Sequence, residues 1–344
     1  MAPFTIDPAE PDLGELARFY ASQVDEPAAA IRERLEWQSR NPSRHPDVPM
    51  VMYGRAASGA IGGAMLCIPH RLRIGPQQHT ALMSSGFYVD AAIRGAGIQI
   101  FLTYRALSAR YILYATTANA QTARLWQSAG GKTIAQTDYE LLRPIRWPGV
   151  LEEVIVRRLG TRASVLARAV APLGHLRALA SRRAPGGELL AVDRPEDAVT
   201  AEAGDGAQPV RDAAFIRWRF FDVPQVDARV YRFRHQGSGA DGFVALTCAR
   251  RGYRGQLRTV YLADTWGRMP SRAFPALLDA IGDRCRATAD LLSMRCLRQD
   301  DEREALAAGS VRRNFDCPIG WFVDSQNLLG AGPVLFPAAA TELV

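Results

Sequence analysis

Residues 88–100 read YVDAAIRGAGIQI, and this stretch decides the fold. The apolar run before it ends at Val89 in the manner of a strand, and a helix-like pattern begins at Ile98. An arginine and two glycines lie between them. Glycine lets a ligand come close to the backbone, and the first N–H groups of a helix attract anions. The stretch therefore predicts either a phosphate-binding turn or an ordinary tight turn.

Length and charge limit the alternatives. A chain of 344 residues is longer than one hydrophobic core usually serves, so we expect two domains. The net charge of +7 comes from arginine, because Lys132 is the only lysine. Arginine suits bidentate contact with phosphate or carboxylate, although net charge by itself speaks mainly to solubility and loose association.

Cysteine usage and hydropathy indicate where the protein works. The five cysteines form no CxxC pair and do not cluster with histidine, which predicts neither disulfides nor a metal site. No apolar run reaches the roughly 18 to 20 residues that cross a bilayer. The N-terminal residues are acidic and lack a basic region followed by an apolar core, so we expect no signal peptide and a cytoplasmic protein.

Periodicity along the first half predicts an α/β domain with a mixed sheet. Two helical segments come first, three β-type runs follow, and a helix, a strand, a helix and a final strand come after the glycines. In the same order these segments are 12–22, 27–39, the runs within 48–89, 98–109, 111–116, 120–128 and 133–142. The helix 98–109 is expected to turn Ile98, Leu102 and Leu107 inward. The first domain is expected to span 1–147.

The second half repeats this order. Strands, a helix, a strand, a helix and a strand follow one another within 188–344, which predicts a structural duplication despite weak identity between the halves. The second copy has GRMPSRAF where the first has its glycines. Residues 148–187 are expected to form a basic helical linker. The stretch 150–183 carries seven arginines and could instead lie on an anionic membrane surface.

Two motifs resemble the GCN5-related N-acetyltransferase (GNAT) superfamily. The segment Arg94–Gln99 is similar to the family's Arg/Gln-x-x-Gly-x-Gly/Ala turn between a strand and a helix, which cradles the pyrophosphate of acyl-CoA. Downstream, the family's Asn, Ala, Leu-Tyr and Gly-Phe positions are matched by Asn119, Ala123, Leu125–Trp126 and Gly130–Gly131. The resemblance covers residues 48–142, and the second half looks like a further, degenerate GNAT-like domain.

The resemblance implies two GNAT-like domains, each a mixed, mostly antiparallel twisted sheet flanked by helices. It implies acetyl-CoA or another acyl-CoA as co-substrate and transfer of the acyl group to an amine such as an amino sugar or a small amine. Cofactor-binding positions would be Phe87, Tyr88, Val89, Arg94, Gly95, Ala96, Gly97, Ile98, Gln99 and Asn119. Candidate proton donors are Tyr88, Tyr111, Tyr114 and Ser84 or Ser85, of which we take Tyr88, Ser85 and Tyr114 as catalytic candidates.

Two departures from the family pattern keep other functions open. Gln99 stands where the family has glycine or alanine, and Trp126 stands where many members have the tyrosine that protonates the leaving thiolate. One alternative is therefore a binding or scaffold protein that holds acyl-CoA without turning it over. Another is an aminoacyl transferase like the Fem ligases, which use tRNA. The absence of aromatic-rich basic stripes argues against nucleic acid.

Overall fold

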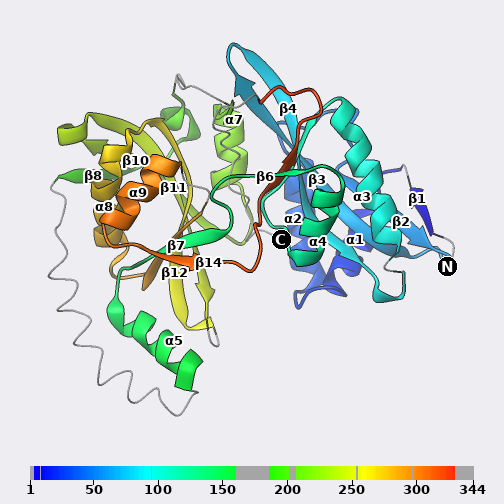
Figure 1. Ribbon diagram of the computed structural model, residues 1–344, viewed down its shortest axis with the longest axis horizontal. Coiled ribbons are helices and arrows are strands. Elements are labelled where there is room, and N and C mark those ends of the chain that lie inside the picture. The colour runs from blue at the N-terminus through cyan, green and yellow to red at the C-terminus, as the bar shows by residue number, and fades with distance from the viewer. Residues whose placement is uncertain are drawn as a thin grey trace. The chain divides into compact units, whose positions relative to one another are not determined.

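The computed structural model describes residues 4–7, 9–93, 95–159, 186–200, 207–252, 255–295 and 298–329, with the side chains of Ala92 and 156–159 left out (Figure 1). The chain divides into two compact units. Unit 1 comprises the described parts of 1–138, 204–225 and 315–344, and unit 2 those of 139–203 and 226–314. Neither unit is one continuous stretch. The boundaries at 147 and 187 suggested by the sequence therefore do not coincide with the edges of these units.

Unit 1 is built on a mostly antiparallel sheet. Along the sheet the strand order is β1-β2-β3-β4-β5-β15-β6, and β9 pairs with β3 beside this path. The only parallel neighbours among these described strands are β4 and β5. The strands are β1 (Phe4–Asp7), β2 (Val51–Ala56), β3 (Ile61–Ile74), β4 (Gln77–Val89), β5 (Ile112–Ala115), β6 (Lys132–Thr133), β9 (Ala207–Pro209) and β15 (Trp321–Val323).

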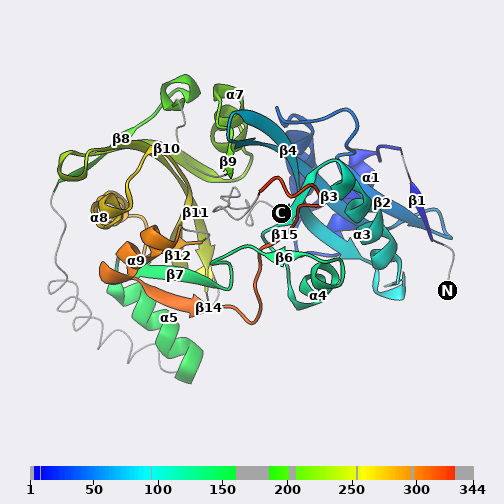
Figure 2. The same ribbon diagram turned by 45° about the horizontal axis from the view of Figure 1, so that its top comes forward.

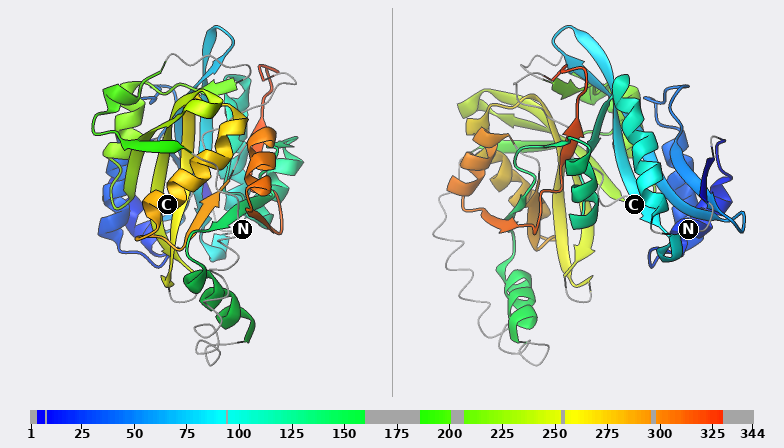
Figure 3. Two further views of the ribbon diagram at one scale, coloured as in Figure 1. Left: turned by 90° about the vertical axis from the view of Figure 1, so that its left-hand side faces the viewer. Right: turned by 45° about the vertical axis from the view of Figure 1, so that its right-hand side comes forward.

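Helices pack on both faces of this sheet. On one face, α3 (Ala96–Ala106) and α4 (Ala120–Ser128) cover a core that includes Met65, Leu82 and Leu113. Strand side chains alternate between faces. Leu66 therefore points to the opposite side, where it lines a cavity together with residues of α1 (Leu13–Ala21) and α2 (Ala28–Ser39). Figure 3 shows these N-terminal helices in blue, with the sheet in lighter blue and cyan. The short helix α7 (Ala213–Ile216) and the π-helical turn Arg217–Phe221 pack on this second face as well, with the Phe215 and Trp218 rings against His70 of β3.

The inward face of α3 differs from the expected one. Ile98 and Leu102 are 52% and 58% exposed, while Ile100, Phe101 and Tyr104 are buried. The reason is the close approach of the helix start to β4. Gly97 lies against Val89, and this contact turns the stripe that contains Ile100 and Tyr104 toward the sheet. The prediction for Ile98 and Leu102 was wrong because α3 has apolar residues on more than one side.

Unit 2 has a second sheet of the same kind, with strand order β14-β7-β13-β12-β11-β10-β8. Here β12 and β13 are the parallel pair, and a bulge lies between β11 and β12. Figure 2 shows α8 and α9 with this sheet, and both contribute to its core. The elements are β7 (Tyr139–Pro144), α5 (Trp147–Leu159), β8 (Gly187–Ala191), β10 (Asp227–His235), β11 (Ala240–Arg251), β12 (Leu257–Arg268), α8 (Phe274–Cys285), β13 (Leu291–Met294), α9 (Gln299–Ala307) and β14 (Val311–Asn314).

The two halves of the sequence exchange strands. We expected 133–142 to be one strand, but the backbone turns at Gln136, whose φ is +58°, and divides it into β6 and β7. Strand β6 stays in the first sheet, whereas β7 pairs with β13 and β14 of the second. In return β15, from the end of the second half, pairs with β5 and β6 of the first sheet. The predicted duplication of sheet and helices is confirmed, with this exchange added.

The expected basic linker is described only at its start. Helix α5 covers the first part of it, and residues 160–185 lie outside the described residues, so the membrane-surface alternative for 150–183 falls largely outside them too. In the described ranges, no helix combines the length and the apolar character that crossing a membrane needs.

Candidate functional site

The strands β4 and β5 form a fork. They pair only where Ala81–Met83 meets Ile112–Tyr114, and beyond this point β4 continues to Val89 without β5 beside it. A cavity of about 230 Å³ opens where the strands part. It is lined by Ser84, Ser85, Gly86, Phe87, Tyr88, Ala115, Thr117, Ala118, Asn119 and Thr122. We call it the fork cavity.

A β-bulge shapes the wall that β4 gives to this cavity. Ala64 of β3 is opposite Tyr88, and Leu66 is opposite Ser85, so three steps on β4 match two on β3. Gly86 supplies the bend with φ +55°, a conformation that glycine adopts without strain. A bulge leaves the extra residue out of the ladder and re-aims its neighbours. The backbone of Gly86 and Phe87, which has no β3 partner in this register, therefore lines the fork cavity instead of extending the ladder.

The helix α3 begins directly after β4. Its N-cap residue is Gly95, and no described side chain caps it, so the first N–H groups of the helix have no partner within it. The dipole at this end is positive. Gln99 and Ile98 are exposed in the first turn, and the Gln99 side chain does not line the fork cavity. Arg94, expected at the entrance, lies outside the described residues.

The glycine pair of this turn has two different surroundings. Gly95 is exposed, whereas Gly97 and Ala96 are buried. A Cβ added at Gly97 would lie 3.0 Å from Val89 Cγ2 and 3.5 Å from Phe87 Cζ. Gly97 is therefore needed for the packing of α3 on β4, and its missing side chain points into the protein. Of the two glycines, only Gly95 is exposed at the N-terminal end of α3.

Two of the three catalytic candidates line the fork cavity. The residue Ser85 is 9% exposed, and Tyr88 is half-buried, with its ring edge-on to the Tyr20 ring at 5.9 Å between centroids. Both come from the bulged part of β4. Both hydroxyl groups thus belong to the short stretch of β4 that contains the bulge.

The third candidate, Tyr114, is not brought together with them. It is fully buried, does not line the fork cavity, and its ring lies 6.0 Å from that of His70 on the face of α1 and α2. Burial raises the pKa of Tyr114 well above its ordinary value. Burial, with Arg219 as a second cause, lowers the pKa of His70 to about 3, so the imidazole is neutral at physiological pH.

Asn119 lines the fork cavity and also caps α4. Its Oδ1 accepts hydrogen bonds from the main-chain N–H groups of Gln121 at 3.1 Å and Thr122 at 2.9 Å. Asparagine is one of the residues preferred at this N-cap position. Because the oxygen is used by the helix, a ligand contact at Asn119 would come from its amide nitrogen.

Trp126 is part of the core and not of the cavity. It is fully buried, with the Phe101 ring 5.5 Å away at 80° and the Tyr104 ring 6.1 Å away at 81°. The indole fills the space between α3 and α4. Helix α4 thus presents no tyrosine hydroxyl at this position.

A second cavity, which the sequence analysis did not anticipate, lies where α1 and α2 meet the sheet. It is lined by Tyr20, Val24, Ile31, Arg34, Leu35, Gln38, Leu66 and Tyr88, and we call it the helix cavity. Tyr88 lines both cavities. The signal available in the sequence was the four-residue spacing of Ile31 and Leu35, which puts both on one face of α2.

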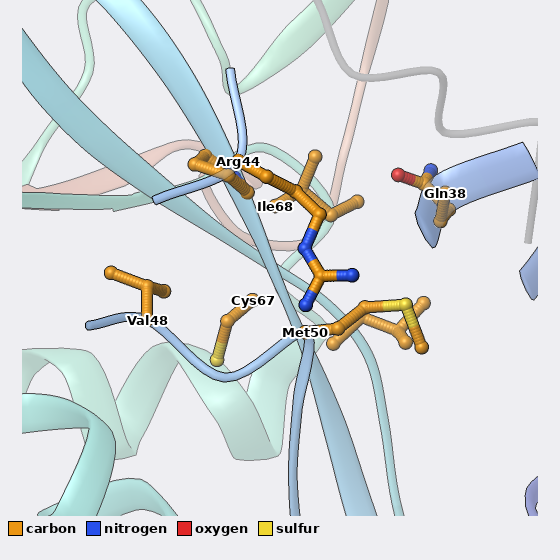
Figure 4. A pocket seen from close by; sticks show the side chains of 8 residues that line it. Gln38, Arg44, Val48, Met50, Cys67 and Ile68 are labelled. Atoms are coloured by element: carbon orange, nitrogen blue, oxygen red, sulfur yellow. The ribbon is translucent and has the colours of Figure 1, made fainter. Parts of the chain in front are cut away.

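A third, smaller cavity adjoins the helix cavity through Gln38 and Leu66 (Figure 4). Figure 4 shows Cys67, Met50 and Val48 around it, with Arg44 reaching in from above. Burial raises the pKa of the Cys67 thiol to about 12, so this sulfur is an apolar wall atom and not a nucleophile. Among the described residues no group of three or more His, Cys, Asp or Glu is placed to hold a metal.

Comparison with known proteins shows which solved structures share this architecture. Neither family models nor curated proteins give a match. Solved structures do, over nearly the whole chain. A conserved protein of unknown function from Enterococcus faecalis V583, described as a probable N-acyltransferase, aligns with TM-score 0.58 and 11% identity, covering 95% of this chain and 74% of that one.

Two further structures agree. The N-myristoyltransferase of Saccharomyces cerevisiae with bound myristoyl-CoA aligns with TM-score 0.56 and 12% identity, over 94% of this chain and 79% of that one. A GCN5-related N-acetyltransferase from Anabaena variabilis aligns with TM-score 0.53 and 13% identity, over 93% and 72%. The chain has a tandem GNAT fold. The fork between β4 and β5 thus belongs to a sheet with the GNAT-like fold, and unit 2 repeats that fold.

Proposed function

We propose that this tandem GNAT protein is an acyl-CoA-dependent N-acyltransferase and that unit 1 binds the acyl donor. The observation that carries the proposal is the fork cavity with the bulged strand β4 on one side. The pantetheine arm would lie in the fork, beside the unpaired backbone of Gly86 and Phe87. The pyrophosphate would lie at the start of α3, where the helix dipole and free N–H groups favour an anion.

Acyl transfer at this site needs few side chains. The amine nitrogen forms a bond to the thioester carbonyl carbon, the C–S bond breaks, and the proton lost by nitrogen ends on the thiolate of CoA. A backbone N–H of the bulge aimed at the carbonyl oxygen would stabilise the negative charge that develops there, and one such donor contributes about 2.7–4 kcal/mol in other enzymes. Five residues with a hydroxyl group line the fork cavity, namely Ser84, Ser85, Tyr88, Thr117 and Thr122. Of these, we take Tyr88 and Ser85 as the residues that could pass the proton.

The described residues that line the fork cavity include no carboxylate, which favours an amine that arrives already neutral. An amine close to its pKa at working pH needs only a weak base or a water molecule to remove its proton after attack. Acetyl-CoA is the simplest donor that fits this scheme. Titrations with acyl-CoAs of different chain lengths would show which acyl chain the protein prefers.

The test compares two charge variants on α3. Gln99→Glu adds a carboxylate to the exposed first turn, which suits the helix dipole but repels a phosphate. Thr103→Glu adds the same charge one turn further along. By calorimetric titration with acetyl-CoA, we expect Gln99→Glu to weaken binding about fivefold to tenfold, by roughly 1 kcal/mol of charge repulsion, and Thr103→Glu to change it little. Absence of acetyl-CoA and longer acyl-CoA binding by the unaltered protein would overturn the proposal.

A protein that binds acyl-CoA without turnover is the second candidate. The burial of Trp126 in the core favours it, because α4 then offers no tyrosine hydroxyl where many GNAT enzymes have one. Release of free CoA from acetyl-CoA in the presence of primary amines, followed with a thiol reagent, separates the two. Tight binding with no thiol release from any amine would support the second candidate.

A further inference from the structure

The phenol of Tyr104 lies at the closed end of the fork, where β4 and β5 begin to part. Tyr104 comes from α3 and is fully buried. Its hydroxyl group donates to the main-chain carbonyl oxygen of Leu82 at 2.5 Å and lies 3.4 Å from that of Tyr114. Leu82 and Tyr114 belong to the last steps at which the two strands pair. One side chain of α3 thus contacts both strands at the point from which the fork opens.

Ser84 connects this point to the fork cavity. It is 6% exposed, lines the cavity and directly follows the last residue of β4 that pairs with β5. Ser84 is two residues from Leu82 and therefore faces the same side of the sheet, the side that α3 covers. There its hydroxyl group forms a hydrogen bond with Tyr104. A chain of hydrogen bonds thus runs from Ser84 at the cavity wall through Tyr104 to the Leu82 carbonyl.

The direction of these hydrogen bonds follows from the protons available. The Tyr104 hydroxyl group has one proton and gives it to the Leu82 carbonyl, which can only accept. Tyr104 therefore accepts from Ser84, and the single hydroxyl proton of Ser84 is used in this bond. Burial raises the pKa of Tyr104 well above its usual value, so the phenol keeps its proton. The two hydroxyl groups therefore fix an orientation and do not carry a proton out of the cavity.

A serine held in this way selects what it binds. A hydroxyl group that rotates freely can donate or accept, whereas Ser84 has only its remaining lone pairs to offer to the fork cavity. Its partner in the cavity must therefore be a hydrogen-bond donor. The pantetheine arm of CoA carries amide N–H groups along its length, and these are donors of the required kind.

We propose that Tyr104 is a positioning residue of the donor site, which holds the two strands where the fork opens and turns the Ser84 oxygen toward an amide N–H of the pantetheine arm. This rests on the proposed function, because the arm must enter the fork cavity to reach Ser84. Ser84 then contacts the donor, and Tyr104 acts through Ser84. The start of α3, proposed above for the pyrophosphate, is a separate contact, so ligands with and without the arm distinguish the two.

The experiment measures affinity by calorimetric titration of the full chain with two ligands. CoA has the pantetheine arm, and adenosine 3′,5′-bisphosphate has nucleotide phosphates without it. The variants are Tyr104→Phe, Ser84→Ala and the double variant. The matched control is Tyr53→Phe, which removes another buried hydroxyl group of unit 1, one that bonds to Asp7 and does not line the fork cavity.

We expect each single variant to bind CoA about fivefold more weakly, the effect of one lost hydrogen bond, with the affinity for the bisphosphate unchanged. The double variant should also lose about fivefold and not about twenty-fivefold, because Tyr104 acts through Ser84 and the two losses are not additive. Tyr53→Phe should leave both affinities unchanged. A general loss of structure would instead weaken the binding of both ligands.

Three results would overturn the inference while the proposed function stands. One is an unchanged CoA affinity in Ser84→Ala. Another is a double variant whose loss is the product of the two single losses, since Tyr104 would then act independently of Ser84. The third is a loss of CoA affinity in Tyr53→Phe as large as in Tyr104→Phe. If neither CoA nor acetyl-CoA binds the unaltered protein, the proposed function fails and this inference fails with it.

Discussion

Trp37 and Trp218, 181 residues apart in the sequence, stack with 4.6 Å between ring centroids and 8° between ring planes. Each indole N–H donates to the main-chain carbonyl of the other residue, at 2.7 Å from Trp37 and 3.0 Å from Trp218. Both side chains are buried. The pair fastens the segment 213–221 to helix α2 within unit 1. In the sequence this segment lies between the two stretches that make up unit 2.

Loss of this pair should destabilise unit 1. Trp218→Ala removes a buried ring and the hydrogen bond that its indole N–H donates to the Trp37 carbonyl, and we expect a loss of about 3–5 kcal/mol in the free energy of unfolding. Trp218→Phe keeps most of the packing and should cost less. Urea unfolding, with limited proteolysis to tell which unit opens first, measures both. Trp266→Phe in unit 2 is the control, and a loss below about 1 kcal/mol for Trp218→Ala would contradict the prediction.

Gly97 should prove sensitive to added volume. A leucine at this position would push Val89 and Phe87 away from α3, and overpacking of this kind costs about 1–3 kcal/mol. We therefore expect Gly97→Leu to lower the melting temperature together with acyl-CoA affinity. A variant that keeps its melting temperature but loses acyl-CoA binding would show that α3 can shift on β4.

His70 should make unit 1 sensitive to mild acid. Burial holds its folded-state pKa near 3, below the value of 6.5 for an exposed histidine, so the unfolded chain binds the proton more readily. The stabilisation is complete above pH 6.5 and falls by about 1.4 kcal/mol for each pH unit below it. Denaturant midpoints at pH 7.5 and 5.5 should differ more for the unaltered protein than for His70→Leu. Equal differences would contradict this account.

Glu140 should be a key charge of unit 2. It is fully buried within reach of Arg251, Arg295 and Arg313, and Ser293 donates to it at 2.8 Å. Burial alone would raise its pKa, but Arg251, with help from Ser293 and Arg295, brings the pKa below its usual value of 4.5. Its stabilising effect is therefore present above pH 4.5 and lost as the pH falls below that value.

The corresponding variant is Glu140→Gln. Removing the carboxylate leaves the partly buried arginines without their partner, and we expect a loss of about 3 kcal/mol at pH 7. The difference from the unaltered protein should shrink at pH 3.5. Chemical unfolding at both pH values measures it, with Glu304→Gln, a half-buried position of α9, as the control. A difference that stays constant between the two pH values would argue against a charge effect.

The structural features that depend on residues close together in the sequence could be predicted from local sequence patterns. The strand, glycines and helix of 88–100 and the Asn119 cap involve contacts a few residues apart, and each is found in the structure. The duplicated order of strands and helices could be predicted for the same reason. Turn chemistry and periodicity are local properties, so they are visible without knowledge of the fold.

What could not be predicted depends on partners that are distant in the chain. The sequence SSGFY does not show that Gly86 is the extra residue of a bulge, because a bulge is defined by the register with β3. Strands β7 and β15 look like ordinary strands of their own halves, and only pairing assigns them to the opposite sheets. The helix cavity was missed because its wall joins α1 and α2 to Leu66 and Tyr88.

The exchange of β7 and β15 has a consequence for how the protein is made. While the ribosome is still translating the second half, the sheet of unit 1 lacks the strand that joins β5 to β6. The fork that β4 and β5 form is thus completed on its outer side only after residue 323 has left the exit tunnel. A nascent chain is therefore expected to remain partly open, and in need of chaperone protection, until β15 has been synthesised.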